Sequence, residues 1–228
     1  MKTEIKEFEP LIDTKYKQFH SRLVSNISPD RILGIKIPLV RKVAAQKVKN
    51  NTFKQVLKNP NKYFIEELEL FGMIVDKLGL SFEETVSYVE KMLPYVDNWA
   101  VCDTMQFNVF KKQPTMLLPC VEKWLKSGEV YTQRFGLVCL LKYYSNQYFN
   151  KQILKYSFLP QSTDYYVQMA QAWFYSVVAC FHYDEIFDLL KSKKLSAKVQ
   201  NFTIKKCCES FRLTPFQKEQ LKQLKKSS

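Results

Sequence analysis

Residues 64–78 read FIEELELFGMIVDKL, and this stretch decides the fold class. Its apolar residues recur every three or four positions, which is the spacing of one face of an α-helix. Gly79 follows directly, and glycine is typical of the position just beyond a helix C-terminus because it adopts a left-handed backbone without steric cost. The sequence therefore predicts an amphipathic helix over residues 64–78 that buries one face in a core.

The flanking sequence repeats the helical pattern. Ser81 and Glu84 form a capping box for a helix predicted to end near Leu93. Pro38 is predicted to open a helix that also carries the basic residues Arg41 and Lys42. Further helices are expected over residues 10–24, 53–57, 98–112, 114–124, 130–144, 148–156, 164–182, 184–191, 196–211 and 215–225.

The composition agrees with this pattern. The chain has 228 residues, of which only 5 are Gly and 9 are Pro, and no run of alternating polarity is long enough to predict a strand. No Gly-, Ser- or Pro-rich linker interrupts the helices. We therefore expect an all-α protein in which residues 1–228 form a single domain of stacked helix pairs.

The net charge of +13 predicts a polyanionic partner. Nucleic acid is the first candidate, an acidic membrane surface is the second, and a charge that only aids solubility is the third. The apolar runs are too short to cross a bilayer, and the charged N-terminus does not resemble a signal peptide. We therefore expect a cytoplasmic protein, associated with the nucleoid if DNA is the partner.

Several kinds of site are disfavoured by the residue inventory. The six cysteines contain no C-x-x-C pair, and the only histidines are His20 and His182, so neither a metal site nor a histidine triad is expected. The five glycines are scattered singly and form no phosphate loop. An enzyme of this sequence would need no cofactor and would work with carboxylates, aromatic rings and basic side chains.

Residues 95–105, YVDNWAVCDTM, contain the first candidate site residues. Asp97 or Asn98 can cap a helix start, and Trp99 and Asp103 are four residues apart, so they lie on one helix face. A carboxylate beside an indole at the edge of a core is a candidate reactive site. A capped helix with a packing tryptophan and a solvated aspartate explains the same spacing.

Arg134 and Trp173 are the next candidates. Arg134 is predicted in the first turn of a helix, where free N–H groups and a guanidinium together can bind phosphate. Trp173 borders an apolar stripe. The 39 residues from Arg134 to Trp173 are close to one HEAT-type helix pair, roughly 40 residues, so both can return to one concave, basic groove. Taken singly, Arg134 also fits a surface charge and Trp173 a core residue.

In order and spacing, these segments resemble the AlkD-type DNA alkylation repair glycosylases, which are built from HEAT-like repeats. The similar segments are LGIKIP at residues 33–38 with Arg41, W-x-x-x-D at 99–103, Gln133–Arg134, the stretch 168–173, and Leu195–Ser196. The resemblance implies an α-α superhelix. It also implies that Asp103 is the catalytic carboxylate, that Trp99 and Trp173 face the sugar, and that Arg134 holds the DNA backbone.

The implied activity is hydrolysis of the N-glycosidic bond of cationic alkylated purines, such as N7-methylguanine and N3-methyladenine, in duplex DNA. The resemblance also implies that the enzyme acts from the backbone side without enclosing the base. The expected partner is alkylated duplex DNA, bound by a monomer. Two alternatives remain open: a non-catalytic protein that binds distorted DNA, and a helical scaffold whose aromatic residues bind protein partners.

Overall fold

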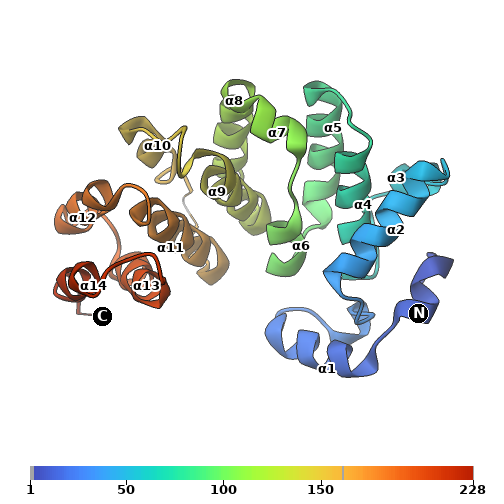
Figure 1. The fold of residues 1–228 in the computed structure, drawn as a ribbon, viewed down its shortest axis with the longest axis horizontal. Coiled ribbons are helices and arrows are strands. Elements are labelled where there is room, and N and C mark those ends of the chain that lie inside the picture. Colours follow the sequence, from blue (N-terminus) through green and yellow to red (C-terminus); the bar gives the residue numbers. More distant parts are fainter. Residues whose placement is uncertain (1–2, 161, 228) are drawn as a thin grey trace. The chain divides into compact units, whose positions relative to one another are not determined.

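The computed structural model describes residues 3–160 and 162–227, and these ranges contain helices and no strand. The helices form two compact units, one up to Gln113 and one from Pro114 onward (Figure 1). The predicted all-α fold of packed helical repeats is confirmed. Among the described helices, none has both the length and the apolar composition needed to cross a membrane.

The first unit is organised around α4, the helix predicted from the opening stretch. Residues Leu68, Phe71 and Ile74 of α4 are buried, and α2, α5 and α6 all pack against this helix. The elements of this unit are η1 (Lys6–Leu11), α1 (Thr14–Leu23), η2 (Pro29–Arg31), α2 (Ile37–Lys49), α3 (Lys54–Lys58), α4 (Ile65–Lys77), α5 (Phe82–Met92), η3 (Leu93–Tyr95), α6 (Trp99–Thr104) and α7 (Asn108–Lys112).

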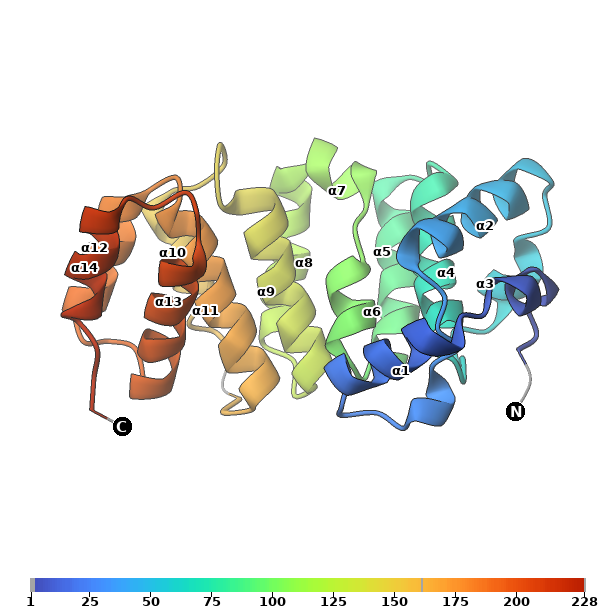
Figure 2. The same ribbon diagram turned by 60° about the horizontal axis from the view of Figure 1, so that its bottom comes forward.

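The second unit is a stack in which α11 lies between α9 and α13 (Figure 2). Its large buried side chains include Phe135, Phe174 and Tyr175. The hydroxyl of Tyr175 lies 2.8 Å from that of Ser157, so this buried phenol has a polar partner. The elements are α8 (Pro114–Leu125), α9 (Val130–Tyr144), α10 (Lys151–Tyr156), α11 (Tyr165–Ala179), α12 (Tyr183–Lys191), α13 (Ala197–Glu209) and α14 (Pro215–Lys222).

The helix ends follow the predicted signals. Ser81 and Glu84 form the capping box of α5, with each side chain bonded to the other residue's backbone N–H. Gly79 follows α4 with φ +62°, in the left-handed region that a helix stop uses. Asn98, one of the two predicted caps, accepts the N–H of Val101 and starts α6.

The prediction of a single helix over residues 98–112 is wrong, because the structure has two helices there, α6 and α7. The chain between them is extended, with ψ of 115° at Met105 and 124° at Phe107. This conformation buries both Met105 and Phe107 and leaves Gln106 exposed. Phe107 and Phe110 then pack edge to face with ring centroids 5.1 Å apart. Burial of both aromatic rings explains why local helical preference is overridden here.

Candidate active site

Helix α6 carries Trp99 and Asp103 one turn apart. The three residues between them, Ala100, Val101 and Cys102, are all buried, whereas Trp99 and Asp103 are both partly exposed. The side-chain oxygen of Asn98 accepts the N–H of Val101 at 3.0 Å, which fixes where the helix begins. The pair therefore lies at the boundary between core and solvent, with the carboxylate within reach of water.

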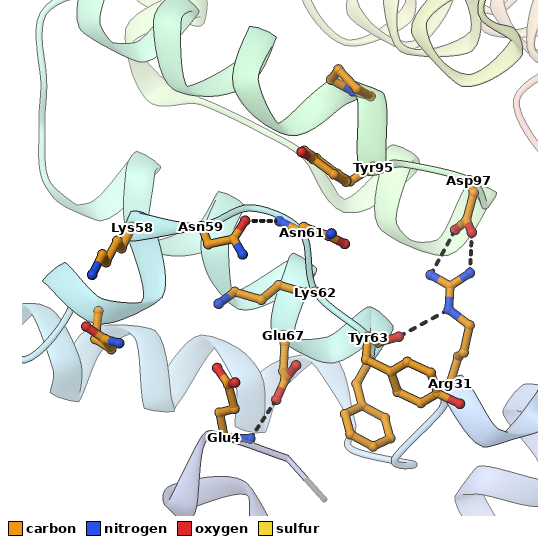
Figure 3. Close-up of a pocket in the computed structure, with 13 residues that line it drawn as sticks. Glu4, Arg31, Lys58, Asn59, Asn61, Lys62, Tyr63, Glu67, Tyr95 and Asp97 are labelled. Carbon is orange, nitrogen blue, oxygen red and sulfur yellow. Dashed lines mark hydrogen bonds and ion pairs between the residues drawn. The ribbon is translucent and has the colours of Figure 1, made fainter. Parts of the chain in front are cut away.

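An arginine fixes the chain that leads into α6 (Figure 3). Both terminal nitrogens of Arg31 pair with the carboxylate of Asp97, and its Nε donates to the backbone carbonyl of Tyr63 at 3.1 Å. Asp97 also accepts a hydrogen bond from Asn98 Nδ2 at 3.1 Å. Of the two predicted capping residues, Asn98 therefore caps α6 and Asp97 anchors the cap to Arg31. Arg31 and Asp97 line one side of a cleft of about 930 Å³.

Glu66 of α4 holds the loop that precedes α2. Its carboxylate accepts the backbone N–H groups of Leu33 at 3.0 Å, Gly34 at 2.7 Å and Ile35 at 3.3 Å. Gly34 has φ +90°, and a Cβ there would lie 2.5 Å from the carbonyl oxygen of Asp13. Burial raises the pKa of Glu66, and the three N–H donors oppose that shift. The LGIKIP segment therefore folds around a buried carboxyl that the sequence analysis did not select.

Glu69, one turn further along α4, was also missed by the sequence analysis. The residue is 3% exposed, and neither carboxyl oxygen has a hydrogen-bond partner among the described residues. Burial, followed by the charge of Glu66, raises the pKa of Glu69 well above the ordinary glutamate range. Only its position on a strongly apolar helix could have drawn attention to it from sequence.

Arg41 and Lys42 both lie on α2 and are exposed, as expected of residues that contact a polyanion. Arg41 also lines a small pocket of about 210 Å³ together with Glu69. Their exposure leaves both side chains accessible to a phosphate backbone, and their contact with DNA remains a prediction.

The prediction that Arg134 lies in the first turn of a helix is wrong. Arg134 is the fifth residue of α9, which begins at Val130. Its position is therefore past the free N–H groups that would help to bind phosphate. Arg134 is 6% exposed, and its Nη1 donates to the backbone carbonyl of Tyr166 at 2.7 Å. The guanidinium therefore links α9 to the first turn of α11, which is the helix that carries Trp173.

Trp173 is partly exposed on α11, between the buried residues Ala172 and Phe174. Tyr165 and Met169 precede it at intervals of four residues and are also at least partly exposed, so the three form one stripe along the helix. The structure thus brings Trp99 together with Asp103 in the first unit, and connects Arg134 to the helix of Trp173 in the second. Convergence of all four residues on one surface remains a prediction.

No three His, Cys, Asp or Glu side chains within residues 3–160 and 162–227 are grouped so that they could hold a metal ion.

The family model described as "DNA alkylation repair enzyme" matches residues 5–211. Because the match covers most of the chain and extends into both units, the chain belongs to the DNA alkylation repair enzyme family. A comparison with curated proteins finds no individual match. Membership confirms the resemblance drawn from the sequence motifs, and it supports a role in DNA repair and an interaction with DNA.

Proposed function

We propose that this protein is a DNA glycosylase that releases cationic alkylated purines, such as N7-methylguanine and N3-methyladenine, from duplex DNA. The observation that carries the proposal is the Trp99–Asp103 pair, which stands at the solvent edge of α6 in a member of a DNA alkylation repair family. A base-release assay with wild type and Asp103→Asn tests it.

The proposed chemistry needs few groups. An alkylated purine with a positive charge leaves as a neutral base, so the leaving group requires no proton. The sugar left behind has oxocarbenium character, which a nearby anion and the negative faces of aromatic rings stabilise. Asp103 supplies the anion and orients or deprotonates the attacking water, and Trp99 supplies one aromatic face.

The second unit contributes the remaining groups in this proposal. Trp173 supplies a second aromatic face. Arg134, predicted to hold the DNA backbone, is buried and bonded to the carbonyl of Tyr166. We therefore assign Arg134 a role in fixing the start of α11, in addition to any phosphate contact made by its remaining exposed edge. The protein is proposed to act as a monomer without a cofactor, in the cytoplasm at the nucleoid.

Binding to undamaged duplex should be independent of sequence and should weaken steeply with salt, because phosphate neutralisation releases counterions. Lys42→Ala is expected to lower the slope of log affinity against log salt by about one unit, since it removes one phosphate contact. Fluorescence anisotropy with a labelled duplex over a range of salt concentrations measures this slope. Lys42 is preferred to Arg134 because it is exposed, so its loss does not disturb the packing of helices.

Lys126→Ala is the matched control for Lys42→Ala. Lys126 is also exposed, but its ammonium is paired at 2.5 Å with Glu122, four residues earlier in the chain. We expect this variant to keep the wild-type slope. Equal slopes for wild type and Lys42→Ala would place α2 away from the DNA.

A further inference from the structure

Four aromatic rings form a continuous row across three neighbouring helices of the second unit. The ring of Tyr131 on α9 lies 5.6 Å, centroid to centroid, from that of Tyr166 on α11. Tyr166 contacts Tyr165 edge to face at 5.3 Å, and Tyr165 contacts Phe202 of α13 in the same way at 5.9 Å. These four residues make up the aromatic row. Packed helices lie about 8–10 Å apart, so a row that crosses three of them is about 20 Å long.

The aromatic row lies at the surface and is held in place from below. Tyr165 is 55% exposed, and the other three residues of the row are partly exposed. Asp164 caps α11 by accepting the N–H of Tyr166 at 2.7 Å, and Arg134 donates to the carbonyl of Tyr166 at 2.7 Å. The first turn of α11 is therefore fixed relative to α9. Rings that are ordered in advance lose less entropy when a ligand binds to them.

Basic side chains flank the aromatic row on α13. Lys198 and Lys205 are exposed and stand four residues before and three residues after Phe202, so the three share one helix face. Residues 191–206 contain six lysines and no acidic residue. Phe202 and Lys205 also line a cleft of about 510 Å³ together with Lys225. The end of the row at α13 therefore combines an aromatic ring with a concentration of positive charge, which attracts a polyanion.

We propose that the aromatic row and its flanking lysines bind an unpaired segment of a DNA strand. Unpaired bases expose flat faces that stack on aromatic rings, and the phosphates of the strand are attracted to the lysines beside them. The bases would lie on an open surface, so no enclosing pocket is needed. This inference goes beyond the proposed glycosylase activity, because it assigns the second unit a ligand whose binding involves no release of a base.

Two other partners match this surface less well. The bases of a duplex are stacked on one another, so a duplex would contact the lysines and leave the rings without bases to stack on. Aromatic residues also anchor protein interfaces, but lysine is depleted there and is abundant here. The nearby acids do not cancel this charge, because Asp164 is engaged as a helix cap and Glu209 lines the cleft beside three lysines.

The first test measures binding of a labelled oligothymidine of about twelve nucleotides by fluorescence anisotropy. Phe202→Leu keeps an apolar side chain and removes the aromatic face, so affinity should fall about 5- to 150-fold, the effect of losing one base stack. Tyr165→Leu should act in the same way, and the high exposure of Tyr165 makes a folding defect unexpected. Phe202→Tyr keeps the ring and should bind as wild type does. Phe216→Leu is the matched control, because Phe216 is an exposed ring on α14 outside the row.

Salt dependence separates stacking from charge. Phe202→Leu should leave the slope of log affinity against log salt unchanged, whereas Lys198→Ala should reduce it by about 0.7, the value for one phosphate of a single strand. Phe202→Leu should also bind undamaged duplex as wild type does, since paired bases present no free faces to the ring. An unchanged slope in Lys198→Ala would contradict the proposed contact between α13 and the phosphates.

Two results would overturn the proposal. Equal affinity of wild type, Phe202→Leu and Tyr165→Leu for the oligothymidine would show that the rings do not stack on bases, and would leave the aromatic row to a protein partner. Equal losses of oligothymidine and duplex binding in Phe202→Leu would show that the ring supports the fold or a duplex contact. Neither result bears on the glycosylase proposal, which Asp103→Asn tests separately.

Discussion

Asp103→Asn is expected to lower the release of N7-methylguanine from alkylated duplex by about two to three orders of magnitude, which is the usual effect of removing one preorganised electrostatic contact. Asparagine keeps the shape of aspartate and removes the charge that would stabilise the developing sugar cation. The position suits this test, because Asp103 is partly exposed at the edge of α6. Single-turnover assays that separate released base from intact DNA measure the rate.

The affinity of the same variant for DNA should hardly change, because a carboxylate near phosphates does not favour binding. Trp99→Ala and Trp173→Ala should reduce the rate less, since each removes only one aromatic face. Uncharged adducts should be poor substrates, because the proposed mechanism includes no group that protonates a departing base. Equal rates for wild type and Asp103→Asn would refute the charge mechanism. Absence of release by both would favour the non-catalytic DNA-binding alternative.

Local sequence signals predicted most of the helices because they depend on neighbours a few residues away. The apolar spacing of residues 64–78 became α4, and Ser81 and Glu84 formed the capping box of α5. The pairing of Trp99 with Asp103 on one face also followed from helical spacing alone, since both lie within α6. These features need no knowledge of the tertiary structure.

The failures involve contacts between residues far apart in sequence. The break after α6 depends on the burial of Phe107 in the core, which helix periodicity does not reveal. The burial of Arg134 and its hydrogen bond to a carbonyl on α11, 32 residues away, were not predicted, and its contact with DNA remains a prediction. The carboxyls of Glu66 and Glu69 were not singled out from the sequence. Their burial is known only once α2 and α6 have packed against α4.

Glu66→Leu is expected to lower the free energy of unfolding by about 3 kcal/mol or more, because it leaves three buried N–H donors without an acceptor and each such group costs about 1–3 kcal/mol. For a protein of this size, the melting temperature should fall by about 2–4 °C for each kcal/mol. Glu66→Gln should cost less, since its amide oxygen still accepts hydrogen bonds from the loop. Urea denaturation, followed by circular dichroism, measures these differences.

Glu69→Leu is the matched control for Glu66→Leu, because it makes the same substitution one turn further along the same buried helix. The expected changes have opposite signs: the loop of Leu33, Gly34 and Ile35 loses its acceptor in one variant, while an unsatisfied carboxyl disappears in the other. A loss of stability in both would mean that Glu69 has a structural partner after all. No loss in Glu66→Leu would show that the loop is held by the burial of Ile35 and the backbone of Gly34, not by the carboxylate.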